Sequence, residues 1–292
     1  MSGGTVVKRA EALGFCAGVR RTVDLALEAA RSRGRPGAGL FTLGPLIHNG
    51  RVLRQLEGLG FSVLDEDCLP ESLAGAVVVI RAHGAGPDVK AGLLRRGAEV
   101  IDATCPKVRK SQLKARSLHE KGFAVFIAGE KNHAEVRGIT LFAPGSIVVE
   151  DENMALADAE TLFSKNNAAK TAIIGQTTIS MTEYRAVCAA IRRFFPDITV
   201  CNTICGATKA RQDALAKLCA CADAIVIAGD PASSNTRRLL AIAAEHEKPA
   251  WIVRSAADLP PGLDALGTVG LSAGASTPDT LIDEIERTLR GG

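Results

Sequence analysis

Three cysteines each stand between a strand-like segment and a helix-like segment, and thiolates are common metal ligands. They are Cys16 in LGFCAGV, Cys105 in DATCPKV and Cys205 in NTICGAT, at intervals of 89 and 100 residues. Each ends a strand-like segment and opens a segment whose apolar residues have helical spacing. A helix N-terminus lowers the pKa of a thiol, which favours the metal-binding thiolate. Three thiolates around one cavity suit zinc or an iron–sulfur cluster, and a [4Fe–4S] cluster on three cysteines would leave one iron open for a substrate.

The other five cysteines show no such pattern. The sequence contains no C-x-x-C pair, and a free cysteine in a reducing compartment is commonly a small buried hydrophobic residue. Cys201 is close enough to Cys205 to compete with it as a ligand. We therefore expect packing or incidental roles for Cys68, Cys188, Cys201, Cys219 and Cys221.

Polar side chains recur at fixed offsets after apolar strands. In three segments a polar residue stands four residues after a glycine. These residues are His48 in GPLIHN, His133 in GEKNHAEV and Ser233 in GDPASSNT. Glu135 and Asn235 follow two residues later in the second and third segments. Hydroxyls, amides and imidazoles beside helix starts favour an anion such as a phosphate. The pair of His133 and Glu135 also offers a proton donor.

A further set of polar residues follows other apolar strands. Its segments are AVVVIRAHG, TAIIGQTTIS and TVGLSAGAST, which carry His83, Thr177 and Ser276. Each lies about 70 residues after its cysteine, so the same unit is repeated three times.

The alternation of short apolar strands with helical stretches predicts three similar α/β units with parallel strands. Ligands of such units gather outside the carboxyl ends of the strands. Three units with these ends converging would surround one central cavity. We expect domains at residues 16–104, 105–204 and 205–292, and residues 1–15 should complete the third by adding the strand that precedes a cysteine.

The composition excludes several classes of protein. The chain has 292 residues, and its net charge of +3 is too small to indicate nucleic acid binding. One Trp and one Tyr do not make a stacking platform for bases. There is no run of 18 apolar residues for a membrane span and no apolar signal segment at the N-terminus, so we expect a cytoplasmic protein.

The motifs resemble the LytB/IspH family of 4-hydroxy-3-methylbut-2-enyl diphosphate reductases. The matching pieces run in family order from Cys16 to Thr277: GFCAGV, GPLIHN, AHG, DATCPKV, GEKNHAEV, QTTIS, CGATKARQ, SSN and AGAST. The sequence departs from the family pattern at HAEVRG, where a His-Pro-Glu is more common, and at the glycine after Cys205. Neither departure removes a functional side chain.

The resemblance implies a trefoil of three α/β domains with pseudo-threefold arrangement around a central [4Fe–4S] cluster. It implies proton delivery by Glu135 with Thr177 and His133. It implies cluster ligation by Cys16, Cys105 and Cys205. The substrate contacts that it implies come from Thr177 and, for the diphosphate, from His48, His83, His133, Ser233, Ser234, Asn235 and Ser276.

The implied reaction is a two-electron, two-proton removal of the substrate hydroxyl as water. It gives isopentenyl and dimethylallyl diphosphate, the last step of the non-mevalonate isoprenoid pathway. The electron donor should be reduced ferredoxin or flavodoxin, because the sequence shows no nucleotide-binding fingerprint. Two alternatives are a quinolinate-synthase-like [4Fe–4S] dehydratase and a non-enzymatic iron–sulfur redox sensor. The first should be richer in Arg and Tyr at its site, and the second has little use for His133 and Glu135.

Overall fold

The computed structural model describes residues 5–32 and 39–291. The chain forms two compact units. Unit 1 comprises Met1–Arg20, Ile47–Arg54 and Gly206–Gly292, and unit 2 comprises Arg21–Leu46 and Gln55–Cys205.

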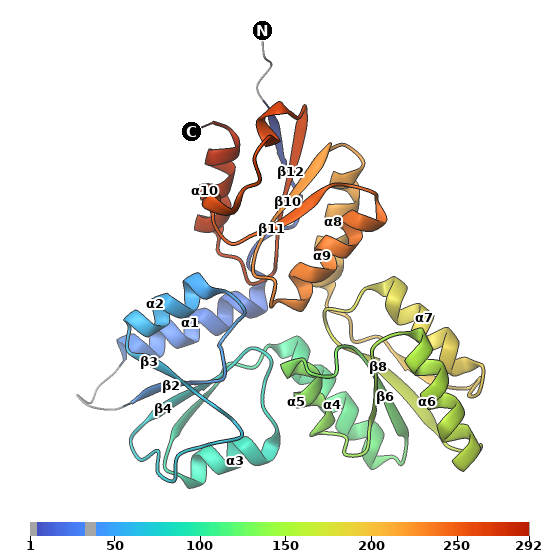
Figure 1. The fold of residues 1–292 in the computed structure, drawn as a ribbon. Coiled ribbons are helices and arrows are strands. Elements are labelled where there is room, and N and C mark those ends of the chain that lie inside the picture. The colour runs from blue at the N-terminus through green and yellow to red at the C-terminus, as the bar shows by residue number, and fades with distance from the viewer. Residues whose placement is uncertain (1–4, 33–38, 292) are drawn as a thin grey trace. The chain divides into compact units, whose positions relative to one another are not determined.

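Unit 2 holds two parallel sheets of four strands each (Figure 1). The first has the order β3-β2-β4-β5, and its strands are β2 (Leu40–Leu43), β3 (Phe61–Leu64), β4 (Val77–Ile80) and β5 (Glu99–Asp102). The second has the order β7-β6-β8-β9, with β6 (Ala124–Ala128), β7 (Ile147–Val149), β8 (Thr171–Gly175) and β9 (Thr199–Cys201).

Unit 1 holds a third parallel sheet in the order β1-β12-β10-β11. Its strands are β1 (Val6–Arg9), β10 (Ala224–Ala228), β11 (Ala250–Val253) and β12 (Thr268–Ala273). The edge strand β1 pairs in parallel with β12, so the two ends of the chain share one sheet. In all three sheets the edge strand that precedes a cysteine (β5, β9 or β1) lies beside the third strand of its repeat (β4, β8 or β12). The three sheets therefore have one topology, and the predicted α/β class with parallel strands is confirmed.

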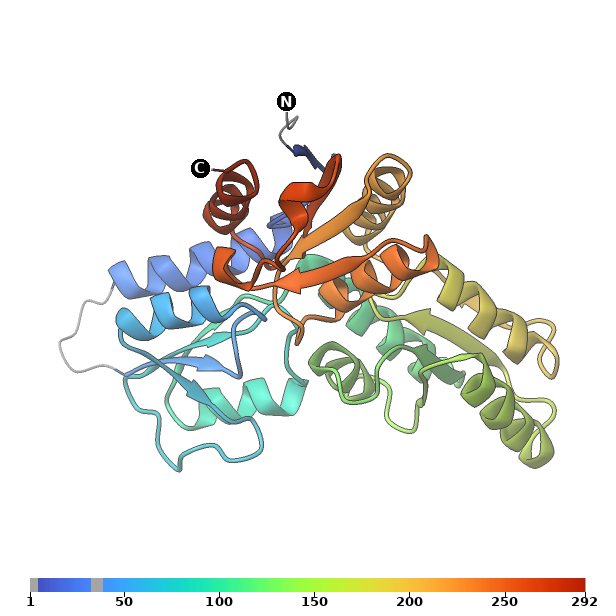
Figure 2. The ribbon, with the colours of Figure 1, turned by 45° about the horizontal axis from the view of Figure 1, so that its top comes forward.

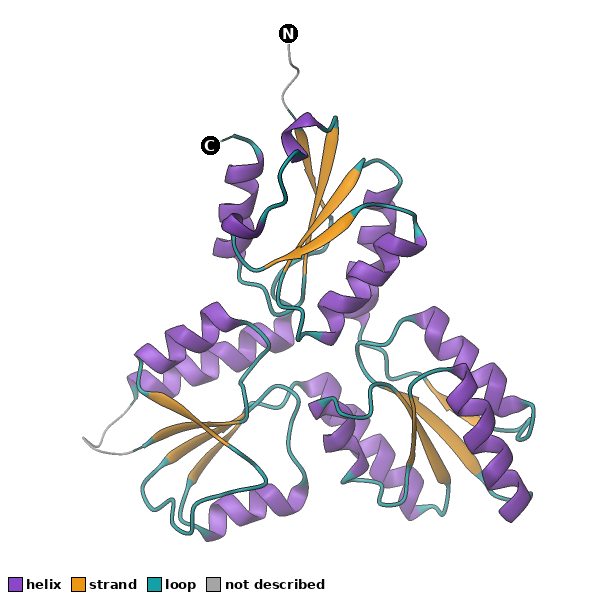
Figure 3. Ribbon diagram, in the orientation of Figure 1, coloured by secondary structure: helices purple, strands orange, loops and turns teal. Residues whose placement is uncertain are grey.

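Ten α-helices occur among the described residues, and they cover both faces of the sheets (Figure 3). On the second sheet, α4 and α5 cover one face and α6 and α7 the other; on the third, α8 and α9 lie opposite α10 (Figure 2). Their bounds are α1 (Ala17–Arg31), α2 (Gly50–Gly58), α3 (Pro87–Arg95), α4 (Pro106–Glu120), α5 (Ala134–Thr140), α6 (Glu152–Lys165), α7 (Met181–Arg192), α8 (Gly206–Cys219), α9 (Ser234–Glu245) and α10 (Asp279–Leu289).

The core lies on both faces of each central strand. In β6, Val125 and Ile127 pack with α4 and α5, whereas Phe126 and Ala128 pack with α6 and α7. Successive side chains of a strand point to opposite faces, so a strand covered on both sides must be apolar throughout. This explains the continuous apolar runs in the sequence. It also leaves the loops at the carboxyl ends of the strands as the place for polar side chains.

Candidate functional site

The three cysteines have equivalent backbone positions in the three sheets. The N–H of Cys105 donates to the carbonyl of Ala82 at 2.9 Å, and the N–H of Cys205 donates to that of Thr177 at 3.0 Å. In unit 1 the N–H of Cys16 donates to the carbonyl of Ala275 at 3.2 Å. Each acceptor stands two residues beyond the end of the neighbouring strand, β4, β8 or β12. The sequence repeat thus corresponds to a repeat in hydrogen bonding.

Each of these cysteines directly precedes a helix, and each thiol is half-buried rather than enclosed. Cys105 is the N-cap of α4, and Sγ of Cys16 accepts a hydrogen bond from the N–H of Val19 at 3.4 Å. N–H groups at a helix start stabilise a thiolate. Thiolates are the usual ligands of iron–sulfur clusters, so the three residues fit such a group.

The remaining cysteines lie in different surroundings. Burial raises the pKa of the Cys188 thiol and of the Cys219 thiol, which disfavours the thiolate. Cys68 and Cys221 are exposed. Cys201 ends β9, and its carbonyl accepts a hydrogen bond from the Tyr184 hydroxyl at 2.9 Å. None of these five cysteines shares the position before a helix.

A glycine directly follows the first strand of each repeat, β2, β6 or β10, and fixes the direction of the chain there. The N–H groups of Gly44, Gly129 and Gly229 donate to the carbonyl of the last residue of β3, β7 and β11, at 2.8, 3.0 and 2.9 Å. Gly129 and Gly229 have the same φ of 158°. A Cβ on Gly129 would lie 2.6 Å from Cβ of Gln176, so a larger residue would displace the neighbouring loop. These glycines therefore place the polar residues that follow them.

His133 and Ser233 each cap a helix after such a glycine. Nδ1 of His133 accepts from the N–H of Glu135 at 3.1 Å at the start of α5. The Ser233 hydroxyl accepts from the N–H of Thr236 at 3.5 Å at the start of α9. Because Nδ1 of His133 is an acceptor here, the neutral ring carries its proton on Nε2.

Glu135 and Thr177 form a buried pair, although 42 residues separate them. Oε1 of Glu135 accepts from the N–H of Thr177 at 2.6 Å, and Oε2 accepts from the Thr177 hydroxyl at 2.7 Å. The exposed fractions are 1% for Glu135 and 6% for Thr177. The carbonyl of Thr177 in turn accepts from the N–H of Cys205. Thr177 thus connects the buried carboxyl directly to one of the three cysteines.

His83 lies beside His133 in unit 2. The ring centroids are 5.0 Å apart, and the rings meet edge to face at 82°. His83 comes three residues after β4, and His133 comes five residues after β6. Unit 2 thus brings together two histidines and a carboxyl that were expected from separate parts of the sequence.

Unit 1 places its polar residues around the start of α9. The hydroxyl of Ser276 donates to the carbonyl of His48 at 3.0 Å. Ser234 and Asn235 are 1% and 3% exposed. Among the described residues, neither the amide nitrogen nor the amide oxygen of Asn235 has a hydrogen-bond partner. Buried polar groups are normally paired, so this amide at a helix start indicates a place for a polar ligand.

Two residues that support the site were not predicted. Oε1 of Gln176 accepts from the N–H of Glu130 at 2.9 Å and so joins the end of β8 to the loop of His133. Nη1 of Arg238 donates to the hydroxyl of Ser234 at 2.6 Å. Arg238 follows Ser234 by four residues, and this helical spacing is a signal that could have identified the contact. Gln176 stands in the motif QTTIS, but nothing in the sequence indicates its partner.

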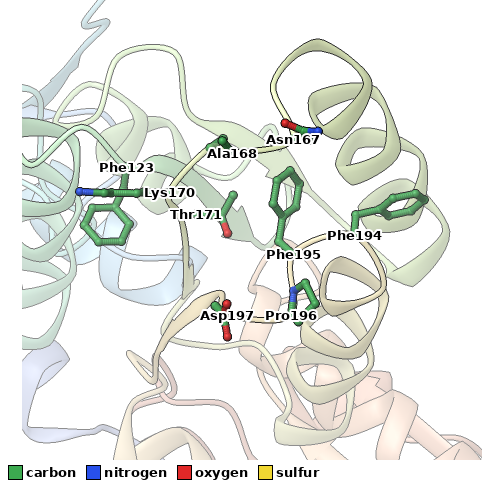
Figure 4. A pocket seen from close by; sticks show the side chains of 10 residues that line it. Phe123, Asn167, Ala168, Lys170, Thr171, Phe194, Phe195, Pro196 and Asp197 are labelled. Carbon is green, nitrogen blue, oxygen red and sulfur yellow. The ribbon is translucent and has the colours of Figure 1, made fainter.

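A separate pocket of about 310 Å³ opens at the other ends of the strands of the second sheet (Figure 4). Phe123, which lines it, directly precedes β6, and Thr171 is the first residue of β8. Ligands of parallel α/β sheets bind at the carboxyl ends of strands, where Glu135 and Thr177 follow β6 and β8. We therefore do not assign the reaction to this pocket. In the described part of the chain, no helix combines the length and apolar character needed to cross a membrane.

Comparisons with known proteins agree on one family. The family described as LytB protein matches residues 7–290. A 4-hydroxy-3-methylbut-2-enyl diphosphate reductase of Treponema denticola is 43% identical and covers 98% of this chain and 100% of its own length. The enzyme of the same name from Anaeromyxobacter is 36% identical, with 98% and 97% covered.

Solved structures give the same result. The E-1-hydroxy-2-methyl-but-2-enyl-4-diphosphate reductase of Plasmodium falciparum has a TM-score of 0.87 at 26% identity, with 97% of this chain and 87% of that chain covered. A structure of (E)-4-hydroxy-3-methyl-but-2-enyl diphosphate reductase, described as the terminal enzyme of the non-mevalonate pathway, has a TM-score of 0.68 at 34% identity and covers 99% and 100%. The expected fold of three similar α/β domains and the expected resemblance are both confirmed, and this chain belongs to the LytB family.

Proposed function

We propose that this chain reduces 4-hydroxy-3-methylbut-2-enyl diphosphate to isopentenyl and dimethylallyl diphosphate. One observation carries the proposal beyond the family assignment: Thr177 joins the buried Glu135 carboxyl to the backbone of Cys205. A proton donor and a cluster ligand are thereby held by the same residue. The reaction needs this proximity, since one C–O bond breaks with uptake of two electrons and two protons.

Membership of the family implies an iron–sulfur cofactor. We propose that it is one [4Fe–4S] cluster held by Cys16, Cys105 and Cys205. When bound, the cluster would supply electrons one at a time and an open iron with Lewis-acid character. The choice of these three thiols is supported by their common position before a helix and by the raised pKa of the buried Cys188 and Cys219 thiols.

We assign the proton transfer to Glu135. Its carboxyl is enclosed, so water does not compete with it, and two hydrogen bonds from Thr177 hold its orientation. The hydroxyl of Thr177 is hydrogen-bonded to Oε2 of Glu135, and this contact places it to relay a proton from that oxygen. Nδ1 of His133 accepts from the N–H of Glu135 and so fixes the ring at the start of α5, and we assign His133 to proton delivery beside Glu135.

Both units supply residues suited to the diphosphate. An anion is bound well by hydrogen-bond donors that already point toward it. Helix starts offer such donors, since their backbone N–H groups stand beside hydroxyl and amide side chains. The open amide of Asn235 is the clearest of these. The proposed substrate contacts are His48, His83, His133, Thr177, Ser233, Ser234, Asn235 and Ser276.

We further propose the domain limits 16–104, 105–204 and 205–292 with 1–15, since each of these ranges supplies all the strands of one sheet. The electron donor is reduced ferredoxin or flavodoxin. The enzyme works in the cytoplasm, where free thiols persist. With the family assigned, we retain neither the quinolinate-synthase-like alternative nor the redox-sensor alternative.

The test is anaerobic purification followed by iron and sulfide analysis and a turnover assay with reduced methyl viologen as the donor. We expect about four irons and four sulfides per chain and formation of both diphosphate products. A cluster-loaded protein that leaves the substrate unchanged with excess reductant would overturn the proposed function.

A further inference from the structure

Helix α4, which begins directly after Cys105, is much more basic than the equivalent helices of the other two repeats. It carries five cations and one carboxylate, Glu120, for a net charge of +4. Helix α1 after Cys16 has a net charge of +1, and α8 after Cys205 has a net charge of +2. The three helices hold the same position beside a cysteine, so the fold alone does not require this charge on α4.

The lysines of α4 form one exposed stripe. Lys107, Lys110 and Lys114 are all exposed, and their spacing of three and four residues places them on one side of the helix. Lys107 lies in the first turn, which contains no acidic residue. Cations at a helix N-terminus oppose the helix dipole and cost stability. Because these cations do not stabilise α4, their presence indicates a role other than stability of the helix.

An apolar pocket of about 310 Å³ within unit 2 reaches α4 at Leu113, which follows Lys110 of the stripe by three residues and so neighbours it on the helix surface. Leu94 and Leu113 line it although they are 54% and 50% exposed, and Phe142 forms part of its wall under the guanidinium of Arg116 at 4.9 Å. Leu113 belongs to α4 and connects the pocket with the lysine stripe. An apolar centre with a charged border is the usual composition of a protein–protein interface.

The pocket also reaches the neighbourhood of the proposed cluster. Thr104, which lines it, is the residue before Cys105, so about 3.8 Å of backbone separates their Cα atoms. Along α4, Lys114 lies nine residues from Cys105, or about 14 Å at 1.5 Å per residue. A carrier docked here would stand close to Cys105.

One carboxylate, Asp102, lies in the pocket and partly offsets its charge. Its Oδ2 contacts Nζ of Lys90 at 3.0 Å and also pairs with Arg109. Burial alone would raise the pKa of Asp102, but hydrogen bonds from Thr104 and Lys90 and the charge of Arg109 hold it below its ordinary value. Asp102 thus engages the cations on its own side and leaves the lysine stripe as the basic border.

From this combination we propose that the lysine stripe of α4 and the adjoining apolar pocket dock an acidic one-electron carrier protein, which delivers electrons beside Cys105. The proposal rests on the proposed function, since a redox partner is needed only if the chain is a reductase. Charge complementarity accelerates such encounters, and the apolar pocket receives a side chain of the carrier.

The test compares two donors on the full-length, cluster-loaded enzyme. Reduced ferredoxin must dock, whereas reduced methyl viologen is a small cation that needs no docking surface. The variant is Lys107→Glu/Lys110→Glu/Lys114→Glu, and the matched control is Lys165→Glu/Lys170→Glu/Arg185→Glu, which reverses three exposed cations elsewhere in unit 2. A glutamate at position 107 suits the helix dipole, so α4 should remain folded.

For the α4 variant at low ionic strength, we expect kcat/KM with ferredoxin to fall about tenfold or more, since steering by charge changes association rates on this scale. The dependence of the ferredoxin rate on salt should flatten. The viologen rate and the cluster spectrum should stay as in the parent. Leu113→Ser should raise the KM for ferredoxin and likewise leave the viologen rate unchanged.

Two outcomes would overturn the docking proposal. One is a ferredoxin rate within twofold of the parent, and the other is an equal fall with both donors, which would assign the lysines to the cluster or to folding. A double variant, Lys110→Glu/Lys114→Glu, leaves Lys107 near the proposed cluster unchanged and must show the same selective loss. The viologen assay of the parent tests the proposed function separately. If the proposed function is wrong, the parent itself forms no product with reduced methyl viologen.

Discussion

Glu135 is bound by two donors from a single residue, and this geometry defines what a substitution there will do. The amide of Glu135→Gln keeps the shape and one acceptor oxygen but has no acidic proton to give. We expect turnover with methyl viologen to fall by roughly 10²–10⁴-fold, while the substrate still binds. Single-turnover kinetics with a separate binding measurement will check this. If turnover remains within about twofold of the parent, Thr177 or a water chain must be the acid instead.

The cysteines differ from one another in position, and their serine variants should differ accordingly. Cys105→Ser removes a half-buried thiol before a helix, and we expect loss of iron and of the visible absorption, because a hydroxyl is a poor cluster ligand. Cys188→Ser in the same unit is the control. Its thiol is buried with a raised pKa, so the variant should keep its iron content even if it is less stable. Normal iron and turnover in Cys105→Ser protein would refute its assignment as a ligand.

At the scale of elements, the starts of α5 and α9 combine a structural role with a proposed binding role. His133 and Ser233 stand four residues after glycines of equal φ, and each side chain accepts an N–H of its own helix. A capping side chain is held in place by the helix that it caps. The capping contact therefore holds the imidazole or hydroxyl beside the backbone N–H groups of the first helical turn, which are the groups that bind anions.

A pair of cap variants separates the two roles. Ser233→Ala and Asp151→Ala each remove a helix N-cap, the latter at α6, so each should lower the free energy of unfolding by about 1 kcal/mol. Only Ser233→Ala should also weaken diphosphate binding, by roughly 1–3 kcal/mol for a lost hydrogen bond to a charged group. Chemical denaturation and calorimetric titration with inorganic diphosphate measure the two effects. Equal diphosphate affinity in both variants would leave Ser233 with a capping role alone.

At the scale of the whole molecule, the repeat explains what could be predicted from the sequence. Gly129 and Gly229 force one backbone path, so residues at equal offsets occupy equal places, and the sequence spacing of His133 and Ser233 was enough to find them. The parallel sheets followed from apolar runs that are buried on both faces. The partners of side chains were not predictable in the same way. Gln176 meets Glu130, and the Glu135 carboxyl meets both donor groups of Thr177, through packing of separate strands that no local pattern encodes.

The third sheet joins both ends of the chain, and its stability should depend on a few residues of β1. Val7 is 4% exposed and packs with Leu271 and Ile285, whereas its neighbour Val6 is 50% exposed. Val7→Asp would bury an unpaired carboxylate in this core, so we expect the free energy of unfolding to fall by about 3 kcal/mol or more. Val6→Asp adds the same group at the surface and should change it by no more than about 0.5 kcal/mol. Because β1 leads to Cys16, Val7→Asp should also reduce the iron bound per chain, and denaturation curves with iron analysis will measure both. Equal stability of the two variants would mean that β1 is not needed to complete the sheet.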